Sequence, residues 1–218
     1  MPRCSRKSAK RAVKFCNPNK KRRETIPPLS KTPFDYLYSN VRAYLNGIQN
    51  QFVTDGGSST EEGTVNWDGI GFLQSAFTST ARGLIAETTV DNSQASTTEY
   101  EPYHGTALTE FVCNPTLDKI FLLSVKELTT PDYGFQKYDV QDPARILRTT
   151  DYAKANNAGQ HIDENHDDDL GGYILTRSPA STQSGGEVRE INYNGNYYGN
   201  TASATSRYVG IVPALCLE

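Results

Sequence analysis

The clearest hydrophobic periodicity of the chain begins at Phe34. From there, apolar side chains recur at intervals of three or four residues: Phe34, Leu37, Tyr38, Val41, Leu45 and Ile48. This spacing places a single apolar stripe along a helix. Pro33 suits the first turn of such a helix and Gly47 suits its end. The pattern therefore predicts a helix over about residues 34–46.

Short apolar runs then alternate with polar segments. Lys119–Leu123 has the length of a strand, and Ser124 and Glu127 have the spacing of a helix-starting capping box. Before this strand and helix, the sequence predicts a polar loop over Thr54–Thr64, followed by the core residues Trp67, Phe72, Leu73 and Phe77. It then predicts a short helix over Ser79–Ile85, which leads into a strand over Glu87–Val90. A polar loop is expected over residues 91–111.

The last third of the chain reads mainly as strands. A short helix fits Thr150–Asn157, and Asn194-Gly195 is the strongest hairpin signal in the chain. Strands are expected over Tyr173–Thr176, Glu187–Tyr193 and Val209–Leu217. Helices early and strands late, joined by long polar loops, predict the α+β class.

Composition supports a single domain with many turns. The 218 residues are 36% hydrophobic and include 17 Gly and 13 Tyr. Such a composition is typical of short strands and loops and excludes a helical bundle. No repeat of fixed period occurs. We expect one domain over residues 34–218, preceded by an arm over residues 1–33.

Charge divides the chain at the same place. Residues 1–31 hold 11 of the 22 Lys and Arg residues and one acid, so their net charge is +10. The remaining 11 bases and 24 acids give the rest of the chain −13. Self-repulsion predicts an arm without a fold of its own, which contacts an acidic surface of another protein or the phosphates of nucleic acid. The residues expected to make these contacts are Arg3, Lys7, Arg11, Lys14, Lys20, Lys21, Arg22 and Arg23.

The four cysteines form no Cys-x-x-Cys pair. Neither a structural zinc site nor a redox motif is therefore expected. We expect Cys113 and Cys216 to be buried thiols and Cys4 and Cys16 to be thiols of the arm. The alternative is a disulfide framework, which small secreted domains use at a higher density of cysteines. No apolar run approaches the roughly 20 residues of a membrane span, and no segment resembles a signal peptide.

Catalytic and metal-binding motifs are missing from the sequence. His104, His161 and His166 fall in expected loops, and no GxSxG, HExxH or P-loop motif is present. The segment His161–Asp169 lacks the ligand spacing of EF-hands and zinc sites, so a solvated acidic loop is expected, with cation binding left open. We predict a protein without catalytic residues or cofactor, although a hydrolase with residues distant in sequence stays open.

A tyrosine- and asparagine-rich segment spans Ile191–Thr201. Tyrosine offers a large contact area at a low entropic cost, and antibody binding loops use the same composition. The alternative is that the tyrosines cover one face of a sheet. Arg177 is expected nearer the core, as a hydrogen-bonding organiser of the Leu175–Pro179 turn. The predicted ligand-binding residues are Tyr193, Asn194, Asn196, Tyr197, Tyr198 and Tyr208.

Seven segments together resemble a family of bacterial and phage domains with a C-type-lectin-like fold of the formylglycine-generating-enzyme type. They are NVRAYLNG at Asn40–Gly47, GFLQSAFTSTARGLI at Gly71–Ile85, TTVDNS at Thr88–Ser93, DKIFLLSVKEL at Asp118–Leu128, TTDYAKA at Thr149–Ala155, LTRSP at Leu175–Pro179 and GIVPALCL at Gly210–Leu217.

The sequence departs from that family in two motifs. The family has a tryptophan-rich WLRSP-like motif, and this chain has ILTRSP at Ile174–Pro179 instead. The family also has a GVRPAL-like motif, and this chain has GIVPAL at Gly210–Leu215. Aromatic and Arg positions of the family motifs are therefore lost. Cys113 and Cys216 also lack the context of the copper-binding cysteines of formylglycine-generating enzymes. The resemblance therefore implies the scaffold and not that catalysis.

Some proteins with this fold are surface or phage-tip proteins whose C-terminal residues are diversified by retroelements. The resemblance thus implies a non-enzymatic module that binds a protein or glycan on a host surface, as part of an oligomeric assembly. The expected location is the virion, with the bacterial cell surface or the cytoplasm as alternatives. The competing expectation is a structural protein of virion assembly or decoration, anchored by its basic arm.

Overall fold

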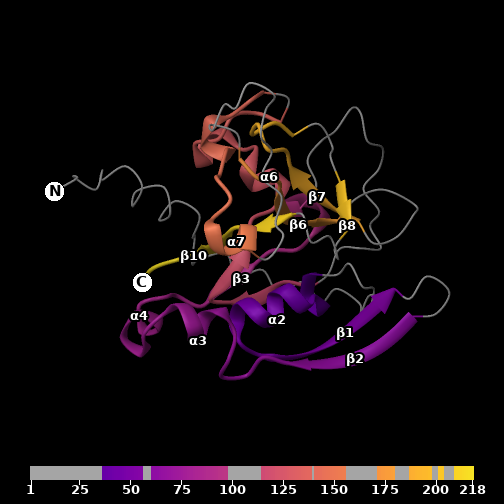
Figure 1. Cartoon of the computed structure of the whole chain (residues 1–218), viewed down its shortest axis with the longest axis vertical. Helices are drawn as coiled ribbons and strands as arrows, with labels where there is room; N and C mark the ends of the chain where they lie inside the picture. Colours follow the sequence, from indigo (N-terminus) through magenta and orange to yellow (C-terminus); the bar gives the residue numbers. More distant parts are fainter. Residues whose placement is uncertain are drawn as a thin grey trace.

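The computed structural model describes residues 36–55, 60–97, 114–138, 140–155, 171–179, 187–197, 201–203 and 209–218. The predicted arm, the loop His161–Asp169, Tyr198 and Tyr208 lie outside these residues. The described part is a mixed α+β structure with short helices and small sheets, as the sequence predicts. Figure 1 shows helix α2 (Asn40–Asn46) and a long hairpin in the lower part and the C-terminal sheet above them.

The predicted N-terminal helix is present, but it is shorter than expected. A 3-10 turn, η2 (Tyr36–Tyr38), precedes α2 (Asn40–Asn46). The Ser39 hydroxyl caps α2 by accepting a hydrogen bond from the Arg42 amide at 3.2 Å, which fixes the start of the helix there. Gly47 ends it in the left-handed region at φ 61°, as Gly at this position favours.

The predicted loop Thr54–Thr64 is instead largely a hairpin. Strand β1 (Gln49–Asp55) pairs with β2 (Thr60–Asn66) in antiparallel register from Gln49↔Asn66 to Asp55↔Thr60. These strands carry few apolar residues, and backbone hydrogen bonds alone define such a ladder. The loop prediction was wrong because these two segments lack the alternation of apolar and polar residues by which strands are predicted from sequence.

Three short helices and a small sheet follow. They are α3 (Phe72–Ala76), α4 (Ser79–Gly83), β3 (Thr88–Val90), α5 (Gln94–Thr97) and β4 (Thr116–Asp118). The predicted second helix is confirmed as α4, with Thr78 as its cap. Strand β3 is confirmed and pairs antiparallel with β4. Helix α5 lies within the stretch that was predicted as loop.

The predicted strand and capping box in the middle of the chain are both confirmed. Strand β5 (Ile120–Leu122) leads into α6 (Val125–Leu128). The Ser124 hydroxyl accepts from the Glu127 amide at 3.1 Å, and the Glu127 carboxylate accepts from the Ser124 amide at 2.8 Å. Short helices η4 (Pro131–Tyr133), η5 (Pro143–Arg145) and α7 (Asp151–Ala155) follow.

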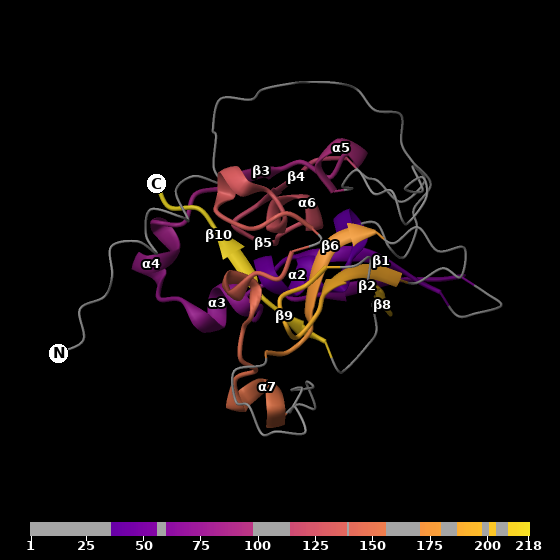
Figure 2. The ribbon, with the colours of Figure 1, turned by 90° about the horizontal axis from the view of Figure 1, so that it is seen from above.

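The C-terminal sheet has the strand order β8-β7-β6-β9. Its members are β6 (Ile174–Pro179), β7 (Glu187–Ile191), β8 (Thr201–Ser203) and β9 (Gly210–Ile211), of which only β9 runs parallel to its neighbour β6. The last strand, β10 (Pro213–Leu215), pairs with β5. Figure 2 shows α7 at one end and β3 and α5 at the other, with β5, β6 and β10 between them.

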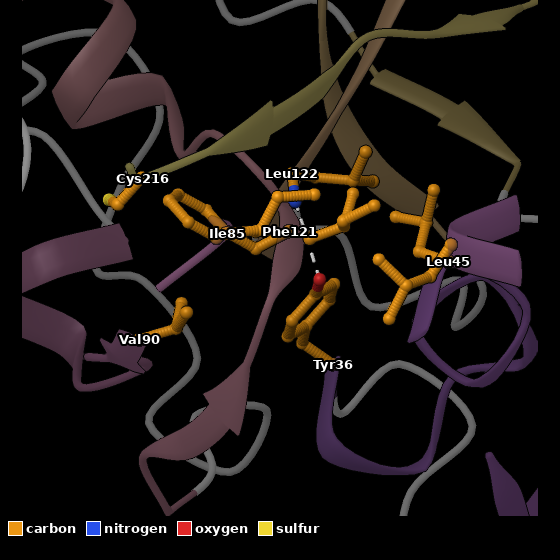
Figure 3. Close-up of a cluster of buried hydrophobic side chains, with 9 residues drawn as sticks. Tyr36, Leu45, Ile85, Val90, Phe121, Leu122 and Cys216 are labelled. Atoms are coloured by element: carbon orange, nitrogen blue, oxygen red, sulfur yellow. Dashed lines mark hydrogen bonds between the residues drawn. The ribbon is translucent and has the colours of Figure 1, made fainter. Parts of the chain in front are cut away.

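The described core consists of two apolar clusters. The first joins α2 to the central strands, and in it the Leu122 amide donates to the Tyr36 hydroxyl at 3.3 Å (Figure 3). The second lies between α6 and the C-terminal sheet. The buried members of the first cluster are Tyr36, Leu45, Leu73, Ile85, Val90, Ile120, Phe121, Leu122 and Cys216, and those of the second are Val125, Leu128, Ile174, Ile191 and Tyr197.

Cys216 is disulfide-bonded, so the prediction of a buried free thiol is wrong for this residue. Its partner lies outside the described residues. Position 216 follows β10 directly, and its carbonyl accepts a hydrogen bond from the Ala86 amide at 2.9 Å. The disulfide and this hydrogen bond therefore both hold the C-terminal end of the chain against the first cluster. No helix in the described part of the chain is long and apolar enough to cross a membrane.

Candidate functional site

The candidate site lies where the C-terminal sheet ends, at the start of β6 and in the turn after β7. We call it the sheet-end surface and define it by Tyr173, Glu190, Tyr193 and Asn194. Tyr173, Tyr193 and Asn194 are partly exposed, whereas Glu190 is 8% exposed. Two of these residues, Tyr193 and Asn194, belong to the binding surface predicted from the sequence.

The Asn194-Gly195 signal does mark a tight turn. The Gly195 amide donates to the Asn192 carbonyl at 2.9 Å, and the Asn192 amide donates to the Asn196 carbonyl at 2.9 Å. Gly195 has φ +76°, where residues with a Cβ are strained. Strands β7 and β8 on either side are antiparallel neighbours, so the predicted hairpin is confirmed.

The turn is held by the buried side chain of Arg145, a residue that no pattern in the sequence indicated. Its Nε donates to the Gly195 carbonyl at 2.7 Å, and its guanidinium also donates to the carbonyls of Leu128 and Gln136 at 3.1 and 3.0 Å. The side chain is 1% exposed. Residue 195 also lacks room for a side chain, because a Cβ there would lie 2.3 Å from the Asp142 carbonyl oxygen. The turn therefore presents Asn194 from a rigid base.

Two tyrosine rings form the aromatic part of the surface. Tyr173 and Tyr193 meet edge to face, with ring centroids 5.5 Å apart and an interplanar angle of 76°. The Gly171 amide donates to the Tyr193 carbonyl at 2.9 Å and fixes the two segments side by side. Burial raises the pKa of the Tyr173 phenol, and the nearby Glu190 and Tyr193 raise it further. Tyr173 therefore lies near both the other tyrosine and the carboxyl group.

Glu190 is a buried carboxyl group at this end of the sheet. It lies directly opposite Leu175 in the β6–β7 ladder, on the face away from the Ile174↔Ile191 pair. Burial raises the pKa of its carboxyl group from 4.5 to about 7. No hydrogen bond or ion pair from a described residue offsets the cost of burial. Carboxyl groups in this condition concentrate at functional sites.

Two predicted members of the binding surface are core residues, so their predicted exposure is wrong. Tyr197 is 2% exposed and packs in the second cluster, and Asn196 is 7% exposed. After the turn at Gly195 the Asn196 carbonyl pairs with the Asn192 amide, and the side chains of both residues 196 and 197 are buried. The alternative interpretation, that tyrosines cover a sheet face, is therefore correct for Tyr197. Tyr198 and Tyr208 lie outside the described residues.

Arg177 is buried, as predicted, at 3% exposure. It stands within strand β6 rather than in a turn, and it links three other segments. Its guanidinium pairs with the Glu127 carboxylate and donates to the carbonyls of Leu122 at 2.8 Å and Asp91 at 3.2 Å. Arg177 therefore organises the junction of β5, β6 and α6.

A second buried ion pair supports the other side of the core. The Arg42 Nε donates to the Asp118 carboxylate at 2.9 Å, and the Thr116 hydroxyl donates to the same carboxylate at 2.6 Å. Burial raises the pKa of the Asp118 carboxyl, and Arg42 opposes that shift. Arg42 and Asp118 have hydrogen-bond partners within the fold, so we assign this pair a role in stability rather than in ligand binding.

The described residues contain no group of three or more His, Cys, Asp or Glu side chains that could hold a metal ion. The three histidines lie outside them. The sheet-end surface instead combines ring faces, an amide and one carboxyl group. This set of groups suits recognition of a ligand by stacking, hydrogen bonding and charge.

The described fold is thus an α+β domain with a polar, aromatic surface at one end of its C-terminal sheet. The chain belongs to the family of a domain of unknown function (DUF6273), whose model matches residues 28–218. None of the curated proteins and none of the solved structures is significantly similar to it.

Proposed function

We propose that the chain is a non-enzymatic ligand-binding module with a C-type-lectin-like domain, which binds a protein or glycan on a host surface. The observation that carries the proposal is the sheet-end surface. There, a rigid turn presents Tyr193 and Asn194 beside Tyr173, above the buried Arg145. Preorganised rings and amides bind with little loss of entropy.

The resemblance in sequence supports the scaffold and the context. Its segments fall on α2, on α3 and α4, on β5 with α6, and on the last strands of the structure. Relatives with the lectin-like fold that display C-terminal Tyr- and Asn-rich residues on a virion or a cell surface supply the proposed location. Tyr198 and Tyr208 are proposed members of the same surface.

Substitution of the two partly exposed turn residues, Tyr193 and Asn194, tests this function. The double variant Tyr193→Ala and Asn194→Ala should lose at least about 30-fold in affinity, as expected when a hot spot worth about 2 kcal/mol is removed. Captured ligand is measured on a glycan array and on a peptide-display library. The matched control is Asp151→Ala on α7, an exposed polar residue, which should bind like the wild type. Equal capture by the double variant and the wild type would exclude this surface.

A second function is favoured by the charge division along the sequence. An arm with a net charge of +10 ahead of a body of −13 suits a virion assembly or decoration protein that is anchored through the arm. Co-sedimentation with capsid proteins or DNA across a salt series tests it. Electrostatic anchoring predicts binding that weakens steeply with salt, and salt-independent association would contradict it.

A further inference from the structure

We propose that the ligand of the sheet-end surface carries an organic cation, an ammonium or guanidinium group, which Glu190 binds beside Tyr173. This inference rests on the proposed binding function and names the chemistry that the surface selects. It draws on three features of the described structure: an unpaired carboxyl group, the aromatic rings next to it, and the lack of an unengaged cation among the described residues on its side of the sheet.

The carboxyl group is placed by strand register. Ile174 and Ile191 face each other in the ladder and point into the second cluster. Their neighbours Leu175 and Glu190 therefore share the opposite face of the sheet, because side chains alternate along strands. Tyr173, two residues before Leu175, belongs to the same face. Glu190 and Tyr173 thus lie near each other on the same face at the end of the sheet.

The groups around Glu190 leave its charge unbalanced. On its face of the sheet, β7 also contributes Val188, and β8 contributes Ala202, which pairs with Val188. Neither carries a charge. Arg177, farther along β6, is already engaged by Glu127 and by two backbone carbonyls. No cation of the described residues therefore neutralises Glu190.

Burying an unpaired carboxylate is costly, whereas a paired one is tolerated. A ligand cation that approaches past Tyr173 and Tyr193 would supply the missing charge. The faces of tyrosine rings attract ammonium and guanidinium groups, and quaternary ammonium ligands are commonly held by such rings. Ring and carboxylate therefore favour the same kind of ligand.

The protonation of Glu190 makes this binding depend on pH in a defined direction. Burial raises the pKa of its carboxyl group to about 7, so the group is mostly neutral at pH 6 and mostly ionised at pH 8. Only the ionised form pairs with a cation. The apparent affinity should therefore be about tenfold higher at pH 8 than at pH 6.

The test uses the full chain and two probes that stay positively charged between pH 6 and pH 8, N-acetyl-lysine methylamide for a peptide ligand and choline for a quaternary ammonium ligand. N-acetyl-norleucine methylamide is the uncharged analogue. Titrations are followed through the carboxyl carbon of Glu190 by NMR. We expect one of the charged probes to bind, to lower the pKa of Glu190 and to bind about tenfold more tightly at pH 8 than at pH 6.

Glu190→Gln should remove this pH dependence and weaken the binding of the charged probe at pH 8 by tenfold or more. The control Glu87→Gln removes an exposed charge elsewhere and should behave like the wild type. The proposal is overturned if neither charged probe binds, if the uncharged analogue binds equally well, or if Glu190→Gln binds like the wild type.

The outcomes also separate this proposal from the proposed function. If capture of the array or library ligand depends on Tyr193 and Asn194 but not on pH or on Glu190, the binding surface stands and the cation proposal falls. If a charged probe binds through Glu190 while the Tyr193 and Asn194 double variant captures ligand normally, the assignment of the wider surface falls instead.

Discussion

At the scale of single residues, Arg145 illustrates how much one buried side chain can support. Its guanidinium donates to carbonyls from three separate segments, those of Leu128, Gln136 and Gly195. Without it, these acceptors, of which those of Leu128 and Gly195 are in buried hydrogen bonds, would lose their partner together. The geometry uses the planar fork of arginine, which lysine does not reproduce.

We therefore predict that Arg145→Lys destabilises the fold by about 3 kcal/mol, because most of these carbonyls would be left without a donor. Chemical denaturation measures the free energy of unfolding. The control Arg148→Lys, at an exposed position three residues on, should change it by less than about 0.5 kcal/mol. If both variants were equally stable, Arg145 would not hold the turn.

Glu190 makes a residue-scale prediction about stability. The pKa of its carboxyl group is raised from 4.5 to about 7 in the folded state, so folding favours the protonated form. This contribution is complete below about pH 4.5 and is lost as the pH rises to about 7. The loss amounts to about 3 kcal/mol at most.

Glu190→Gln removes this titration. Relative to the wild type, the variant should become progressively more stable between pH 4.5 and pH 7, with a plateau above. Urea denaturation at a series of pH values measures the difference. A difference that stays constant across this range would show that the Glu190 carboxyl titrates normally.

At the scale of elements, the turn after β7 divides neighbouring tyrosines between two roles. Tyr193 precedes Gly195 and stays partly exposed, whereas Tyr197 follows it and lies in the second cluster at 2% exposure. The side of the turn on which a tyrosine stands therefore decides whether it is available to a ligand.

Truncation of each ring should separate the two roles. Tyr197→Ala should cost about 3–5 kcal/mol of stability, as expected for removal of a buried aromatic side chain. Tyr193→Ala should cost under about 1 kcal/mol while it lowers affinity for the ligand. Thermal unfolding of both variants is the measurement. Equal losses of stability would contradict the division.

The elements also show what could be predicted from the sequence. Ser124 and Glu127 predicted the start of α6, and Asn194-Gly195 predicted the turn, because both signals act through hydrogen bonds between near neighbours. The hairpin of β1 and β2 was missed because its pairing is carried by the backbone. The burial of Tyr197 was missed because composition does not reveal which way a side chain faces. Glu190 and Arg145 depend on contacts between distant segments, which no local pattern contains.

At the scale of the whole molecule, the disulfide of Cys216 connects the last strand to another part of the chain. Cys216 lies beside Ala86, whereas the Asn92 side chain donates to the carbonyl of Asn114, the residue after Cys113. The seven residues from Ala86 to Asn92 include extended strand β3, and their six Cα–Cα steps span about 20 Å if extended throughout. A disulfide requires Cα atoms within about 7 Å.

We therefore expect Cys4 or Cys16, rather than Cys113, to be the partner of Cys216. Peptide mapping under non-reducing conditions should find the C-terminal peptide linked to a peptide of the first 16 residues. Reduction should then lower the stability by about 2–4 kcal/mol. A link between Cys113 and Cys216 would contradict the expected partner.

The central claim, that the sheet-end surface binds a ligand, is tested most directly by ligand capture with the wild-type chain and the Tyr193→Ala and Asn194→Ala double variant. The account predicts that the wild type retains a ligand class from the glycan array or the peptide library. It also predicts that the double variant loses at least about 30-fold in affinity for that class, with its thermal midpoint lowered only by the loss of the hydrogen bond that the Asn194 side chain accepts from the Asn196 amide at 3.0 Å. Capture of the same ligand with unchanged affinity by a well-folded double variant would contradict it.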